Sequence, residues 1–226
     1  MKIKSLPDLE TPLTPVAKGA GRPKAAELEA RYQCLMHTAA RLFLDKGFGN
    51  VSLEMIAREA RVAVRTIYVK YGGKMGLLRE AMAANRTRFF QQMDMDTDPR
   101  PLRTVIDDFA LRFFDLVTAP EAVALQRMLA AEAKANPDLI QAFYAVGPKV
   151  TQGALLRYFE RADVRAQLID DAPLAQLPVF LLNCIMGDQM SRVLMTEPPR
   201  TRDEQRVALQ ARMRLFYRAV LKDAAG

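Results

Sequence analysis

Residues 47–78, GFGNVSLEMIAREARVAVRTIYVKYGGKMGLL, predict two short helices separated by a tight turn. The first helix is expected over about residues 53–60, where apolar side chains recur on one face. Ser52 is suited to cap its free amides. The second helix is expected from Ala63 to Tyr71. Two helices joined by so short a turn must cross steeply, which leaves the second free to enter a DNA major groove.

Several positions in this stretch keep apolar, aromatic and basic residue types in a fixed register. They are Ile56-Ala57, Ala60, Val62, Thr66-Ile67-Tyr68, Tyr71, Lys74 and Leu77-Leu78. In this spacing they resemble the second and third helices of the TetR family of transcriptional regulators. The sequence departs from the family at Arg61, where glycine is usual in the turn, and at Ala63, where a capping serine is usual. A left-handed backbone at Arg61 would cost about 1 kcal/mol, and the lost cap about 0.5 to 2 kcal/mol.

The resemblance implies DNA contacts along this motif. The family positions that bind the DNA backbone correspond to Thr66, Tyr68 and Lys74, and the start of the first helix at Ser52 offers amides to a phosphate. Base edges are expected to meet Arg65, Val64 and Lys70, with Arg65 suited to bidentate contact with guanine. Two simpler interpretations stay open, since Tyr68 would also serve as a core aromatic and Lys70 as a solvated charge.

The positive charge lies almost entirely in the first third of the chain. Residues 1–74 hold 13 Lys and Arg against 7 Asp and Glu, whereas residues 75–226 hold 20 against 19. An uneven basic end is typical of a polyanion-binding module, because neutralised phosphates release counterions. A membrane surface is the rival polyanion. We disfavour it because the N-terminal MKIKSL offers neither an apolar core nor the glycine that myristoylation requires.

Residues 1–25 predict a flexible basic arm, since their prolines and glycines cannot sustain a helix. Its end at Gly21-Arg22-Pro23-Lys24 is extended and slim, so Arg22 and Lys24 could enter a narrow minor groove. A disordered, solubilising tail is the equal alternative. A helix is expected over about residues 26–46, with its apolar stripe covering the two-helix motif. Residues 26–73 would then form a three-helix DNA-binding domain.

Residues 74–226 predict helix after helix with no alternating strand-like run, so the expected fold class is all-α. The expected helices cover about 74–95, 101–118, 121–135, 139–161 with a kink at Gly147-Pro148, 172–194 and 202–224. In TetR relatives such a region is a ligand-binding and dimerisation domain. The Asn136-Pro137-Asp138-Leu139 start and the Gly147-Pro148 break resemble the AcrR-like branch.

The last two helices of this region are expected to pair with their copies in a four-helix bundle of a homodimer. The residues assigned to this interface are Phe180, Met190, Leu209, Met213, Phe216 and Val220. Completion of a single monomer core is the alternative. A pocket for an apolar or aromatic small molecule is expected among Phe109, Phe113, Met128, Phe143, Tyr144, Asn183 and Met186, although core packing would explain most of them equally well.

Other classes of protein find no support in the sequence. It shows no phosphate loop, paired catalytic carboxylates or nucleophile elbow, and we predict no enzymatic activity, cofactor or metal. Cys34 and Cys184 lack metal-like spacing and are expected to be buried rather than redox-active. With no signal peptide or membrane span predicted, a cytoplasmic protein is expected. We therefore predict a ligand-released, dimeric repressor of a palindromic operator. The alternative is a constitutive or non-specific structural DNA-binding protein.

Overall fold

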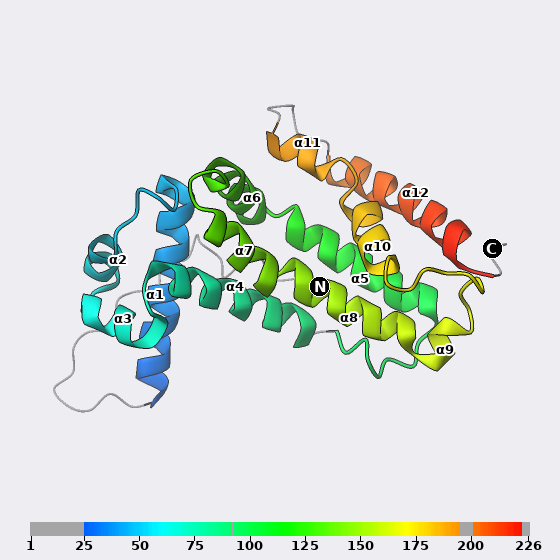
Figure 1. Ribbon diagram of the computed structural model, residues 1–226, viewed down its shortest axis with the longest axis horizontal. Coiled ribbons are helices and arrows are strands. Elements are labelled where there is room, and N and C mark those ends of the chain that lie inside the picture. The colour runs from blue at the N-terminus through cyan, green and yellow to red at the C-terminus, as the bar shows by residue number, and fades with distance from the viewer. Residues whose placement is uncertain (1–24, 92, 195–200, 223–226) are drawn as a thin grey trace. The chain divides into compact units, whose positions relative to one another are not determined.

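The computed structural model of the protein describes residues 25–91, 93–194 and 201–222. Within these ranges the chain forms helices joined by loops, with an isolated bridge between Leu168 and Leu221 (Figure 1). This confirms the predicted all-α fold. The chain divides into two compact units: one takes the described residues up to Phe89 with residues 124–147, and the other takes the rest.

The first unit contains the predicted three-helix motif and additional helices. It comprises α1 (Ala25–Lys46), α2 (Leu53–Ala60), α3 (Val64–Tyr71), nearly all of α4 (Lys74–Gln91), α6 (Pro120–Glu132) from residue 124, and α7 (Pro137–Val146). Figure 1 shows α1, α2 and α3 grouped together. The α1 stripe is buried as expected, and the rings of Phe43 and Phe48 lie 5.1 Å apart in this core.

Helices that are distant in sequence complete this first core. Met128 and Leu129 of α6 and Leu139 of α7 are buried in the same hydrophobic cluster as the α1–α3 side chains. The predicted boundary between residues 73 and 74 therefore does not coincide with a boundary between compact units. As a division of functions, the three predicted domains 1–25, 26–73 and 74–226 stay a prediction.

The second unit is built on the apolar face of α5 (Leu102–Val117). Its other helices are α8 (Pro148–Glu160), α9 (Ala162–Arg165), α10 (Leu177–Met186), α11 (Gln189–Leu194) and α12 (Arg202–Val220). The expected break at Gly147-Pro148 separates α7 from α8. The short α9 had no counterpart in the prediction. A capping box between Thr201 and Glu204 begins α12 and satisfies its first free amides.

The helix expected over residues 172–194 is two helices, and a tertiary contact explains the break. Gly187 ends α10 with a φ of 54°, a conformation that favours glycine. The Arg212 guanidinium of α12 donates to the carbonyls of Cys184 and Ile185 at 2.5 and 3.0 Å. It thereby satisfies the last carbonyls of α10 and sits where a Cβ at Gly187 would have to go.

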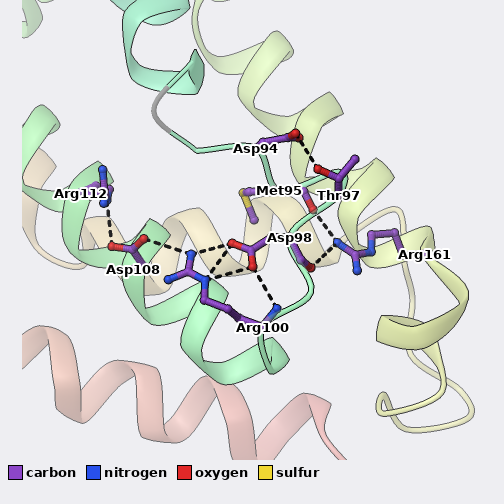
Figure 2. Close-up of polar contacts among 8 residues, drawn as sticks. All are labelled: Asp94, Met95, Thr97, Asp98, Arg100, Asp108, Arg112 and Arg161. Carbon is purple, nitrogen blue, oxygen red and sulfur yellow. Dashed lines mark hydrogen bonds and ion pairs between the residues drawn. The ribbon is translucent and has the colours of Figure 1, made fainter.

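The acidic stretch after α4 is a loop of the second unit, and α4 ends at Gln91 instead of near Met95. Figure 2 shows Arg161 reaching this loop, where it donates to the carbonyls of Met95 and Asp98 at 2.8 and 3.0 Å. Arg100 hydrogen-bonds the Asp98 carboxylate through its side chain and backbone N–H, which holds the pKa of Asp98 below its usual range.

The predicted dimer stripe on the last helix is corrected by the structure. Leu209, Met213, Phe216 and Val220 are all buried within the second unit, and the Phe216 ring lies 5.4 Å from that of Phe180. The i, i+4, i+7 spacing identified a buried face correctly but could not say what covers it. The side chain of Met190 lies outside the described residues.

The described residues contain no helix long and apolar enough to cross a bilayer. They also hold no group of three or more His, Cys, Asp or Glu side chains placed to bind a metal ion. Cys34 and Cys184 are free thiols and half-buried, one in each unit. Burial raises the pKa of the Cys184 thiol, which disfavours the reactive thiolate.

Candidate nucleic-acid interface

The turn between α2 and α3 has the local chemistry that the sequence predicts. The Ser52 hydroxyl accepts a hydrogen bond from the backbone N–H of Met55 at 3.2 Å and so caps α2. Arg61 adopts the left-handed conformation with φ 55°, where the family usually places glycine. Ala63 precedes α3 without a side-chain cap. The left-handed arginine and the missing cap both make this turn less stable, as expected. The position of α3 therefore depends on its packing against the rest of the unit.

Helix α3 is held by one face. Ile67 is fully buried, and Val64 and Tyr71 pack partly buried against the same core. These three positions cluster on one side of the helix at about 100° per residue. The prediction that Val64 meets base edges is therefore not supported, because its side chain contributes to the anchoring face. Val69, two residues from Ile67, falls on the other side of the helix by the same periodicity.

The opposite face of α3 is exposed. Arg65 lies on it, Tyr68 is 58% exposed and Val69 is 78% exposed. The exposure of Tyr68 disfavours the core-aromatic alternative and leaves its hydroxyl available to a phosphate. Thr66 is half-buried beside this face. A basic and an aromatic side chain displayed together on an outward helix face fit contacts with DNA backbone and base edges. Sequence reasoning overlooked Val69.

Lys70 contacts aromatic side chains of its own unit. Its ammonium lies over the Tyr32 ring of α1, 2.8 Å from the ring centre, and 5.5 Å from the centre of the Tyr71 ring. The two rings meet edge to face at 6.5 Å. Burial raises the pKa of Tyr71 to about 12, so that ring stays neutral. Lys70 thereby stabilises the contact between α1 and α3. A base contact from its ammonium would require it to leave the Tyr32 ring, and that contact stays a prediction.

Lys74 also contacts its own unit. Its ammonium donates to the backbone carbonyls of Phe48 at 2.8 Å and Val51 at 3.1 Å, with Gly49 at 3.5 Å, and lies 4.5 Å from the centre of the Phe48 ring. The side chain thereby fastens the start of α4 to the loop before α2. The predicted phosphate contact from this ammonium would require it to leave these carbonyls.

The start of α2 already carries a carboxylate. Glu54 accepts hydrogen bonds from its own backbone N–H and from Ser52, and these bonds lower the pKa of its carboxyl. A carboxylate is favourable at the positive end of a helix. It also competes there with a phosphate, so the predicted phosphate site at Ser52 must accommodate a neighbouring negative charge.

Helix α6 also contacts the loop between α1 and α2. The Glu132 carboxylate accepts from the backbone N–H of Gly49 at 2.8 Å and from the Asn136 amide at 2.5 Å. A surface hollow of about 340 Å³ lies beside this contact, lined by Leu44, Gly47, Ala124, Arg127, Met128, Ala131 and Glu132. Glu132 thus links α6 directly to the loop that leads into α2.

The predicted pocket residues do not gather within either unit. Met128, Phe143 and Tyr144 belong to the first unit, and the other four belong to the second. In the second unit the rings of Phe109 and Phe113 are stacked with centroids 5.5 Å apart, whereas Asn183 is exposed. Of the predicted set, only Met128 lines the hollow beside α6. The minor-groove candidates Arg22 and Lys24 lie outside the described residues.

The chain matches known families over both of its parts. Residues 35–81 match the family described as bacterial regulatory proteins, tetR family, and residues 104–219 match the AefR-like transcriptional repressor, C-terminal domain. The chain belongs to the TetR family. It is therefore a DNA-binding transcriptional repressor rather than an enzyme, as predicted.

Individual relatives are distant. The chain is 22% identical over 176 residues to the uncharacterized HTH-type transcriptional regulator YdeS of Bacillus subtilis, which covers 76% of this chain and 85% of YdeS. A putative TetR-family regulator from Mesorhizobium loti superposes with a TM-score of 0.71 at 18% identity, covering 88% of this chain and all of that one. The flavonoid-responsive regulator FrrA superposes with a TM-score of 0.69 at 23% identity, covering 86% and 98%. These likenesses show the shared fold.

Proposed function

We propose that this TetR-family repressor reads its operator with the exposed face of α3, using Arg65 for a guanine, and acts as a homodimer that an apolar or aromatic small molecule releases from DNA. The observation that carries the base-reading role is the division of α3 into a buried face at Ile67 and an exposed face bearing Arg65 and Tyr68. Tyr68 and Thr66 are suited to the flanking phosphates. Because bacterial DNA lies in the cytoplasm, we expect the protein to act there.

Replacing Arg65 by alanine tests this role. Loss of a bidentate guanine contact should weaken operator binding by about 1 to 3 kcal/mol and relax the preference at one base pair of each half-site. The measurement is a titration of a selected operator and of its single-base variants at fixed salt. Arg58→Ala is the matched control, because it removes the same charge from the exposed surface of α2. An Arg65 variant that weakened all sequences alike would reduce α3 to a non-specific DNA-binding element.

The dimer proposal rests on apolar side chains of α10 and α12 that are exposed in the structure. On α12, Val207 and Leu215 are 65% and 63% exposed, and on neighbouring α10 Val179 and Phe180 are partly exposed. Four apolar side chains on two adjacent helices favour burial against a copy of the same surface. Among the predicted interface residues whose side chains the structure describes, Phe180 remains a candidate.

Leu215→Gln should weaken dimerisation about 30-fold, at roughly 1 kcal/mol of lost apolar burial in each copy. Analytical ultracentrifugation over a concentration series measures the shift. Val150→Gln on α8, a similar change at an exposed valine outside α10 and α12, should leave the association constant unchanged. If the two variants had the same association constant, α12 would not be part of the dimer interface.

Effector release is supported by two features. FrrA is flavonoid-responsive by name, and this chain stacks Phe109 on Phe113 on a helix rich in buried apolar side chains. Glu132 connects α6 to the loop before α2, so a ligand that displaced α6 would disturb the start of α2. A ligand can weaken operator binding only by its differential affinity for the two forms. Operator affinity that no flavonoid or related aromatic compound changed would leave a constitutive repressor. The AcrR-like branch stays a prediction.

A further inference from the structure

Val69 occupies an unexpected place for an apolar side chain. Val69 is 78% exposed, a larger exposed fraction than that of any other large hydrophobic residue that the structure describes. Two residues from the buried Ile67, at about 100° per residue, it points almost directly away from the core. Its neighbour one turn back on the same face is Arg65.

Folding alone does not account for this valine. Valine is a weaker helix former than alanine or lysine, because its branched side chain loses rotamer freedom in a helix. Helix α3 has only eight residues and begins without a side-chain cap, so it gains nothing from a poor helix former at an exposed position. An isolated surface valine is ordinary elsewhere. Here it lies on the face of α3 that we propose meets DNA.

We propose that Val69 reads the C5-methyl group of a thymine in the operator. The thymine methyl is the one apolar group that a standard base pair shows in the major groove. The methyl groups of valine can neither donate nor accept a hydrogen bond, so the thymine methyl is their natural contact there. Against the polar edge of another base, Val69 would remove water without replacing the lost hydrogen bonds, which discriminates against that base. This inference rests on the proposed base reading by α3.

The spacing of Arg65 and Val69 adds a prediction about the operator. One helical turn carries the two side chains about 6 Å apart along α3, and successive base pairs are separated by about 3.4 Å. Selection of binding sites from random duplexes should therefore yield half-sites in which a guanine is followed or preceded, within one or two steps, by a thymine.

Methyl deletion on both partners tests the contact. Replacing that thymine by deoxyuridine in the selected duplex should weaken wild-type binding about fourfold, or ~0.8 kcal/mol for one buried methyl group. Val69→Ala should bind the thymine duplex several-fold more weakly and should not distinguish thymine from deoxyuridine. The unfolding temperature of Val69→Ala should be unchanged or slightly raised, because alanine favours the helix. Val150→Ala provides the matched valine control.

The outcomes separate this inference from the proposed function. Equal sensitivity of wild-type and Val69→Ala proteins to deoxyuridine at every thymine would overturn the role of Val69. If Arg65→Ala still relaxed the guanine preference, base reading by α3 would stand without it. If neither variant altered any base preference, base reading by this face of α3 would fail together with the Val69 contact. Undiminished operator affinity of Val69→Ala would also overturn the thymine contact.

Discussion

Gly76→Ala should lower the free energy of unfolding of the first unit by about 3 kcal/mol. Gly76 lies in the first turn of α4, where a Cβ would overlap the backbone carbonyl oxygen of Tyr71 at the end of α3. Because that oxygen belongs to the backbone, no side-chain rotation relieves the overlap, and the two helices must separate. In an open helix the same change would stabilise by up to about 1 kcal/mol. The sign of the effect therefore reports the close approach of α3 and α4.

Chemical denaturation followed by circular dichroism measures this loss, and Gly72→Ala is its control. Gly72 has a φ of 72° but nothing within 4 Å of the position of its missing Cβ. Alanine there should cost only about 1 kcal/mol for the left-handed backbone. A Gly76 variant as stable as the wild type would show that α4 approaches α3 less closely than described. A folded Gly76 variant should bind its operator more weakly, because the end of α3 has moved.

Lys74→Met should destabilise the first unit by about 3 kcal/mol, since hydrogen bonds from charged groups contribute roughly 1.5 kcal/mol or more each. The substitution removes the two short bonds to Phe48 and Val51 while keeping most of the apolar stem. The carbonyls in the loop before α2 would then lose their partner. Thermal and denaturant unfolding measure the loss. Lys46→Met, a change at an exposed lysine in the last turn of α1, should cost far less.

The salt dependence of DNA binding distinguishes the two roles of Lys74. A lysine that neutralises a phosphate would lower the slope of log affinity against log salt by about 1 when removed. A lysine bound to carbonyls should leave that slope unchanged at temperatures where the variant is folded. A reduced slope together with unchanged stability would restore the phosphate contact predicted from the family pattern.

Local chemistry made most of the helix-turn-helix segment predictable. Ser52 caps α2, Arg61 takes the left-handed backbone and Ile67 is buried, each as expected from its neighbours in sequence. These features depend on interactions within a few residues or on the periodicity of one helix face. The breaks at Gly147-Pro148 and near Gly72 were predictable for the same reason.

The assignments that the structure corrects or leaves open depend on partners distant in the chain. The α12 stripe is buried against its own unit rather than a copy, and periodicity cannot distinguish these surfaces. In the sequence, Lys74 and Lys70 look like free basic side chains. In the structure, Lys74 donates to the carbonyl of Phe48 and Lys70 lies over the ring of Tyr32. Val69, which the sequence analysis did not single out, is exposed.

The sequence by itself determined the helical class, the helix-turn-helix and the membership of the TetR family, because periodicity, caps and motif spacing are properties of neighbouring residues. Only the tertiary structure decided which charged side chains bind groups of their own unit and which side chains are exposed and free to contact DNA. That division depends on packing between segments such as α1 and α3, or α6 and the loop before α2. A side chain's availability is set by what lies against it, and residues far apart in the chain supply those neighbours.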